Sequence, residues 1–84
     1  MYNLDELEGY EITIFGDVIK KKTSRYLASN PDGNQLIYVH IKRKKYRVDY
    51  LVAQKFIPNP LGLTQVIHKD FNKRNNNVLN LKWI

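Results

Sequence analysis

Apolar and polar residues alternate along much of the chain, and this pattern predicts a series of short strands. Residues 10–14 and 18–22 flank a glycine-containing turn and are expected to form a first hairpin. Residues 36–42 carry apolar side chains at every second position, which is typical of a half-buried strand. Residues 46–48 are expected to pair with that strand, so the second hairpin has a tip of three cations at residues 43–45.

One helix is predicted over residues 50–56, where Asp49 is a suitable N-cap and Pro58 follows the last turn. Beyond it, short strands are predicted at residues 65–68 and 81–84, separated by a polar loop that is rich in asparagine. These elements predict an α+β fold of small antiparallel hairpins, one helix and a C-terminal unit of two strands.

The length of 84 residues is enough for one small domain. Within it we expect a hairpin-rich module over residues 1–47 and a helix-plus-strands module over residues 48–84. Cysteine is absent, which excludes disulfides and thiolate ligands and fits a reducing compartment. No stretch is long and apolar enough for a membrane span or a signal peptide, so we expect a cytoplasmic protein.

The net charge of +6 is unevenly distributed along the chain. The first seventeen residues carry five acidic and no basic side chains, whereas the rest carries all fourteen basic side chains against three acidic ones. A small domain with so basic a segment attracts polyanions, of which nucleic acid is the commonest. A basic surface that only keeps the protein soluble is the alternative explanation.

The densest polar pattern lies between residues 66 and 83. It reads Val-Ile-His-Lys-Asp-Phe-Asn-Lys-Arg-Asn-Asn-Asn-Val-Leu-Asn-Leu-Lys-Trp. The segment resembles the ββα-metal motif of HNH endonucleases of the phage homing type, in which Asp/Asn-His-x-Asp-Gly-Asn-x-x-Asn-Asn is followed by Asn-Leu-x-Trp. The matching positions are His68, Asp70, Asn72, Asn75, Asn76, Asn80, Leu81 and Trp83. Residues 48–53 and 56–60 are also similar to the family, and the resemblance weakens before residue 36.

The resemblance implies roles for two residues of this segment. His68 corresponds to the family's general base, a neutral imidazole that takes a proton from the water attacking a phosphate. Asn80, on the facing strand, corresponds to the amide that holds this imidazole in one tautomer and orientation. The resemblance also implies a divalent ion, Mg²⁺ or Mn²⁺, beside the scissile phosphate.

The ligand positions for such an ion are altered. The family's first ligand directly precedes the histidine, where this chain has Ile67, a side chain without a donor atom. Its second ligand lies on a helix after the last strand, and the sequence ends at Ile84 before such a helix. Phe71 also replaces a glycine of the family's turn. We therefore expect no metal ion or other cofactor, a vestigial His68 and Asn80, and little or no cleavage.

Two groups of cations are candidates for contact with DNA phosphates. They are Lys42, Arg43, Lys44, Lys45 and Arg47 around the second hairpin, and Lys69, Lys73 and Arg74 in the motif loop. A charged hairpin that merely discourages edge pairing is the alternative for the first group. In the loop, hydrogen bonds among the asparagines and Asp70 are expected to give rigidity. Trp83 is expected in the core and His40 on the surface.

Three functions compete on this basis. The first is a DNA-binding protein derived from an HNH homing endonuclease that does not cut. The second is a metal-dependent nicking enzyme, completed by dimerisation or by a longer chain. The third is a phage-encoded inhibitor of a host or defence protein, acting in the host cytoplasm. A homodimer is a further possibility, because the short strands leave exposed edges.

Overall fold

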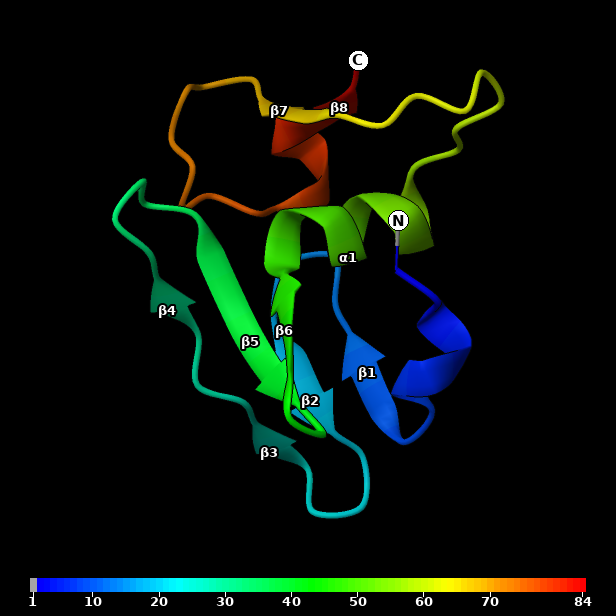
Figure 1. Ribbon diagram of the computed structural model, residues 1–84, viewed down its shortest axis with the longest axis vertical. Helices are drawn as coiled ribbons and strands as arrows, with labels where there is room; N and C mark the ends of the chain where they lie inside the picture. Colours follow the sequence, from blue (N-terminus) through cyan, green and yellow to red (C-terminus); the bar gives the residue numbers. More distant parts are fainter. Residues whose placement is uncertain (1) are drawn as a thin grey trace.

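The computed structural model, which describes residues 2–84, has three small antiparallel sheets arranged around one helix (Figure 1). The first sheet contains β1 (Tyr10–Ile12), β2 (Val18–Lys20) and β3 (Arg25–Tyr26), and the second contains β4 (Asn30–Pro31), β5 (Ile37–Ile41) and β6 (Lys44–Arg47). The third pairs β7 (Val66–His68) with β8 (Leu81–Trp83). Two short 3-10 helices, η1 (Leu4–Leu7) and η2 (Val78–Asn80), complete the elements. The predicted α+β class is confirmed.

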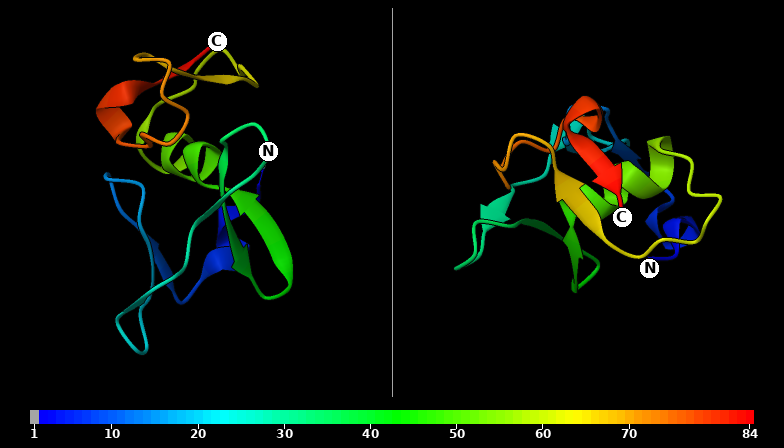
Figure 2. Two further views of the ribbon diagram at one scale, coloured as in Figure 1. Left: turned by 90° about the vertical axis from the view of Figure 1, so that its left-hand side faces the viewer. Right: turned by 90° about the horizontal axis from the view of Figure 1, so that it is seen from above.

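The helix α1 (Val48–Phe56) lies between the two N-terminal sheets and the β7–β8 pair (Figures 1 and 2). Its side chains Val48, Leu51, Val52 and Ala53 are fully buried, and so is Val39 of β5. Burial of such aliphatic side chains removes about 25 cal/mol of unfavourable hydration per Å². The helix is therefore the common support of all three sheets. No helix within residues 2–84 has the length and apolar character required to cross a bilayer.

The start of α1 differs from the prediction. The helix begins at Val48 with Arg47 as its N-cap residue, and the predicted cap Asp49 lies one residue inside it. The carboxylate of Asp49 is buried and accepts hydrogen bonds from the Arg47 guanidinium and from the backbone N–H of Tyr50. The prediction of Asp49 as N-cap was wrong because this residue belongs to a buried ion pair.

The N-terminal strands are also shorter than the pattern predicted. Residues 13–17 turn sharply, because the Thr13 hydroxyl accepts from the backbone N–H groups of Phe15 and Asp17 and Gly16 has φ +89°. The strands β3 and β4 were missed, since two residues are too few for a period of two to show.

The β7–β8 pair has a register that determines which side chains face the core. His68 pairs with Leu81 and Val66 pairs with Trp83. All four of these side chains are buried, whereas Ile67 between them lies on the outer face. Trp83 is 6% exposed and its indole Nε1 donates to the carbonyl of Ile57 at 3.1 Å, so its predicted core position is confirmed.

Candidate nucleic-acid interface and histidine site

His68, at the end of β7, is 7% exposed and has a buried side-chain partner. Its Nε2 lies 2.8 Å from Oδ1 of Asn76, which is 6% exposed. Because an amide oxygen only accepts, this contact requires a proton on Nε2, and in the neutral ring Nδ1 is then the nitrogen with a lone pair. No hydrogen bond to Nδ1 is found within residues 2–84. The contact with Asn76 therefore fixes the orientation of the ring.

Asn76 is in turn held by the distant first hairpin. A Cβ atom on Gly16 would lie 2.9 Å from the Cβ of Asn76, so only glycine permits this approach. Nearby, the backbone N–H of Val78 donates to the carbonyl of Ile14 at 2.8 Å. The turn after β1 thus positions the residue that orients His68.

A partly buried ion pair, in which Asp49 is the buried partner, lies beside the imidazole. The guanidinium of Arg47 donates to both oxygens of Asp49, through Nε at 3.1 Å and Nη2 at 2.7 Å. Oδ2 of Asp49 is 3.9 Å from Nε2 of His68. Partial burial lowers the pKa of Arg47, but the hydrogen bond and the charge of Asp49 outweigh it, so the net shift of the pKa is upward. Arg47 therefore stays charged and paired inside the protein.

Asn80 makes no hydrogen bond to the imidazole within residues 2–84. Its amide nitrogen donates to Oδ1 of Asp70 at 2.9 Å and to the carbonyl of Asn75, and its oxygen accepts from the backbone N–H of Asp70. The expected hydrogen bond between Asn80 and His68 was therefore wrong, because Asn76 is the residue whose side chain meets the imidazole. The site roles of His68 and Asn80 stay predictions.

The motif loop is organised around the carboxylate of Asp70. This group accepts from the side chains of Asn75 and Asn80 and from the backbone N–H of Asn72, at 3.0, 2.9 and 2.8 Å. The hydrogen bond from Asn75 is the largest of the causes that hold the pKa of Asp70 below its usual value. The expected hydrogen bonding within the loop is confirmed.

A cavity of about 460 Å³ opens beside His68. Its lining residues are Leu36, Arg47, Val66, Ile67, His68, Phe71 and Lys73. The imidazole is reached through this cavity, and Lys73 places an exposed cation at its wall. Ile67 presents only carbon atoms where the implied metal ion would need an oxygen or nitrogen donor, so this position does not fit a divalent ion.

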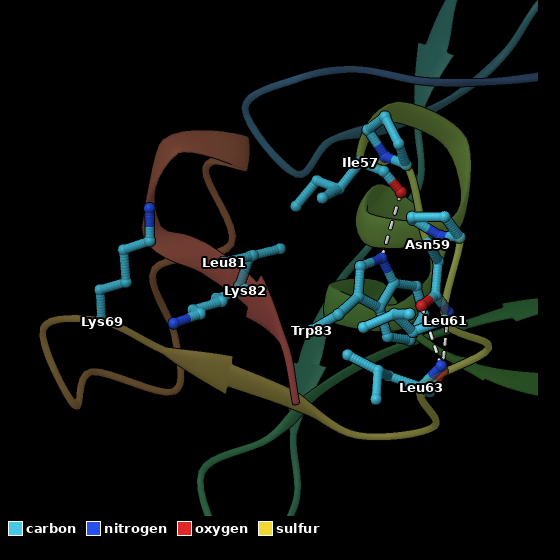
Figure 3. Close-up of a pocket in the computed structure, with 10 residues that line it drawn as sticks. Ile57, Asn59, Leu61, Leu63, Lys69, Leu81, Lys82 and Trp83 are labelled. Atoms are coloured by element: carbon cyan, nitrogen blue, oxygen red, sulfur yellow. Dashed lines mark hydrogen bonds between the residues drawn. The ribbon is translucent and has the colours of Figure 1, made fainter.

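A second cavity of about 540 Å³ lies beside Trp83 and does not include His68 (Figure 3). Its wall is formed by residues 57–61, Leu63, Lys69 and β8, and the side chain of Asn59 is hydrogen-bonded to both backbone groups of Leu63. This cavity is therefore distinct from the candidate histidine site.

The predicted cations form two separate groups. The loop after β7 lies in the upper part of the view in Figure 1 and the tip of the β5–β6 hairpin in the lower part, whereas the turn between β2 and β3 forms the lower end of the 34 Å long axis (Figures 1 and 2). Seven of the eight predicted cations are exposed, and they are Lys42, Arg43, Lys44, Lys45, Lys69, Lys73 and Arg74. Arg47 is the exception, because its guanidinium is half buried against Asp49 and the ring of Tyr50, and its contact with DNA stays a prediction.

Two of the hairpin cations have partners within the chain. Nζ of Lys44 lies 2.9 Å from Glu6 in an exposed ion pair, and Nζ of Lys45 lies 4.0 Å from the centre of the Tyr38 ring. The hairpin therefore offers Lys42 and Arg43 most directly to a ligand. His40, on β5, is exposed as predicted.

A third basic group was missed by sequence reasoning. The turn between β2 and β3 exposes Lys20, Lys21, Lys22 and Arg25. The run of three lysines was visible in the sequence but was assigned to the returning strand of a hairpin.

Comparison with known proteins identifies the class of fold. No family model matches the chain. The sequence is 37% identical over 84 residues to the uncharacterised HNH endonuclease L245 of Acanthamoeba polyphaga mimivirus, covering 95% of this chain and 26% of the relative. The structure matches that of the HNH homing endonuclease I-HmuI, solved to describe DNA binding and cleavage by that enzyme. The TM-score is 0.79 and the identity 29%, over 92% of this chain and 47% of that one.

The fold is thus that of an HNH endonuclease, and the resemblance to the HNH-type family is confirmed. The chain spans about a quarter of the length of the viral relative and about half of the I-HmuI chain.

Proposed function

We propose that this chain is a DNA-binding module derived from an HNH-type endonuclease and that by itself it does not cut DNA. The observation that carries the proposal is the position of Lys73, which lines the same cavity as His68. Lys69 and Arg74 are exposed on the same loop. A phosphate at the mouth of this cavity would meet cations before it reached the imidazole, which is the arrangement that backbone binding requires.

The loop that carries these cations is rigid. Asp70 and its asparagine partners fix the backbone that follows Lys69, and the N–H of Lys69 donates to the carbonyl of Asn80 at 2.7 Å. Cations on a fixed backbone lose less conformational entropy when they bind than cations on a mobile loop. The rigidity therefore supports a binding role for the loop.

The absence of cleavage is supported by the chemistry of Ile67. In the HNH-type motif the residue before the histidine is a metal ligand, and the aliphatic side chain of isoleucine cannot donate an electron pair to an ion. Loss of such a ligand removes charge stabilisation worth several kcal/mol in metal-assisted hydrolysis, which is orders of magnitude in rate.

The proposal is tested with supercoiled plasmid in a gel that reports both mobility shift and nicking. The purified chain is incubated with plasmid at increasing salt, with Mg²⁺, with Mn²⁺ and with chelator. We expect a shift that weakens steeply with salt and no nicked product. The absence of any shift at low salt would contradict the binding role.

Metal-dependent nicking is the second candidate function, and one observation favours it. Nε2 of His68 is held by Asn76, so in the neutral ring Nδ1 has the lone pair that a general base needs. Under this alternative the wild type nicks plasmid in Mg²⁺ or Mn²⁺ and His68→Ala does not. Ile67→Asp is the informative companion, because nicking gained by this variant alone would show that the site lacks only that one ligand.

A further inference from the structure

Phe71 has one feature that gives the fold no stabilisation and one that opposes folding. Its side chain is 93% exposed to solvent, the largest exposed fraction among the exposed large apolar side chains of residues 2–84. Its backbone has φ +62°, in the left-handed region that side chains with a Cβ disfavour. Neither packing nor backbone preference explains a phenylalanine at this position.

The ring is nevertheless presented by a fixed backbone. The N–H of Phe71 donates to the carbonyl of His68 at 3.0 Å, and its two neighbours belong to the hydrogen-bonded loop around Asp70. The backbone N–H of Asp70 is also bonded to Asn80, at 3.1 Å. Phe71 is therefore an exposed aromatic side chain on a rigid turn.

The surroundings of Phe71 favour one kind of ligand. Lys69, Lys73 and Arg74 are exposed on both sides of it in the same loop, and Phe71 shares the cavity wall with His68. An aromatic ring among cations suits a nucleic acid, in which a flat apolar base is attached to a phosphate. An apolar protein surface would be a poor match for three unpaired cations.

We propose that Phe71 stacks on the face of a nucleobase when the flanking cations hold the DNA backbone. This inference rests on the proposed DNA-binding function and adds a base-contacting residue to it. Stacking requires either an unpaired base or two adjacent base pairs that unstack. The proposal therefore predicts a preference for DNA with a bulged or single-stranded base over fully paired duplex.

The test compares four proteins on three DNA ligands of one sequence. The ligands are a paired duplex, a duplex with one bulged 2-aminopurine and a single strand, each followed by fluorescence anisotropy and by 2-aminopurine emission. The proteins are the wild type, Phe71→Gly, Phe71→Leu and Leu79→Ala. Phe71→Gly suits the left-handed backbone, so it removes the ring without straining the fold. Leu79→Ala removes another exposed apolar side chain, at 81% exposure.

We expect the wild type and Leu79→Ala to bind the bulged duplex and quench 2-aminopurine. Phe71→Gly is expected to bind it about 5- to 150-fold more weakly, the loss that removal of one base–aromatic stack produces. Phe71→Leu should lose the quenching. Quenching with the single strand as well as the bulged duplex would mean that Phe71 stacks on any unpaired base. Quenching with the bulged duplex alone would mean that it inserts at a bulge, and either result supports the proposal.

Two outcomes overturn the inference. If the wild type binds DNA and Phe71→Gly binds the bulged duplex equally well with the same quenching, Phe71 does not stack, while the DNA-binding function stands. If the wild type binds none of the three ligands, both the inference and the proposed function fail.

Discussion

The imidazole of His68 is held by Asn76, whose side-chain oxygen lies 2.8 Å from Nε2, although four other asparagines lie between residues 72 and 80. Asn76→Ala would leave a buried ring N–H without a partner, and an unsatisfied buried group costs about 1–3 kcal/mol. We therefore expect a loss of this size in the free energy of unfolding, measured by urea denaturation. Asn34→Ala, at an exposed position whose side chain has no hydrogen bond within residues 2–84, should change it by less than about 0.5 kcal/mol.

Gly16 sets the position of Asn76, and two other glycines provide controls for that role. Gly9, Gly16 and Gly62 all have positive φ, but only at Gly16 would a new Cβ meet another residue closely. Ala at Gly9 or Gly62 should cost about 1 kcal/mol from backbone conformation alone. Gly16→Ala should cost a further 1–3 kcal/mol, roughly, from overpacking, as measured by urea denaturation. Equal losses at all three sites would show that the contact with Asn76 yields easily.

Much of the fold could be predicted because its signals are local. Alternation identified β5, the asparagine-rich segment located the turn after β7, and an apolar stripe followed by prolines located α1. The burial of Trp83 followed from the need of a small domain for a large apolar side chain. These features depend on residues a few positions apart.

The partner of His68 could not be predicted in the same way. Asn76 and Asn80 carry the same functional group, and either can reach a histidine across a short loop. The choice depends on the path of the loop, which is set by Gly16, a residue far away in the sequence, and by Asp70, which binds the Asn80 amide. Family resemblance assigned the residue type correctly but not the contact.

The pair of Arg47 and Asp49 was missed for a related reason. From the sequence, Arg47 has the common role of a surface cation and Asp49 that of a helix cap. The structure shows instead that Asp49 is only 2% exposed and that its carboxylate is paired with the Arg47 guanidinium. Burial depends on how α1 packs against the three sheets, which a local pattern does not report.

This ion pair should be far more sensitive to loss of one partner than to loss of both. Arg47→Met leaves a buried carboxylate uncompensated and should lower the free energy of unfolding by about 3–5 kcal/mol at neutral pH. The double variant Arg47→Met/Asp49→Leu should recover most of that loss. The control is Lys44→Met, which breaks an exposed pair with Glu6 and should cost less than about 1 kcal/mol. A double variant no more stable than Arg47→Met would contradict this account.

Asp70 should make the stability depend on pH in the acid range. Its pKa is lowered in the folded protein, chiefly by the hydrogen bond from Asn75, so the unfolded chain binds a proton more readily. The stabilisation is fully present above the unfolded pKa, near 3.8, and is lost as the pH falls through the lower folded pKa. Asp70→Asn should therefore approach the wild type in stability below that pH, measured by urea denaturation at a series of pH values. A stability difference that does not change with pH would exclude an ionic role for the carboxylate.

The separation of the basic groups leads to a test with variants of equal charge. Lys73→Gln/Arg74→Gln, Lys42→Gln/Arg43→Gln and Lys21→Gln/Lys22→Gln each remove two cations from a different end or turn of the molecule. For binding to a paired duplex, each cation that contacts a phosphate contributes about 0.9 to the slope of log affinity against log salt.

We expect the first two pairs of substitutions to reduce the slope, because the motif loop and the hairpin tip were both predicted to contact DNA. The third pair should leave it nearly unchanged. The measurement is anisotropy at several salt concentrations with a duplex longer than the protein's 34 Å axis, which about ten base pairs span. Since all three variants have the same net charge, equal reductions would mean that the charge of the whole protein, and no particular surface, attracts DNA.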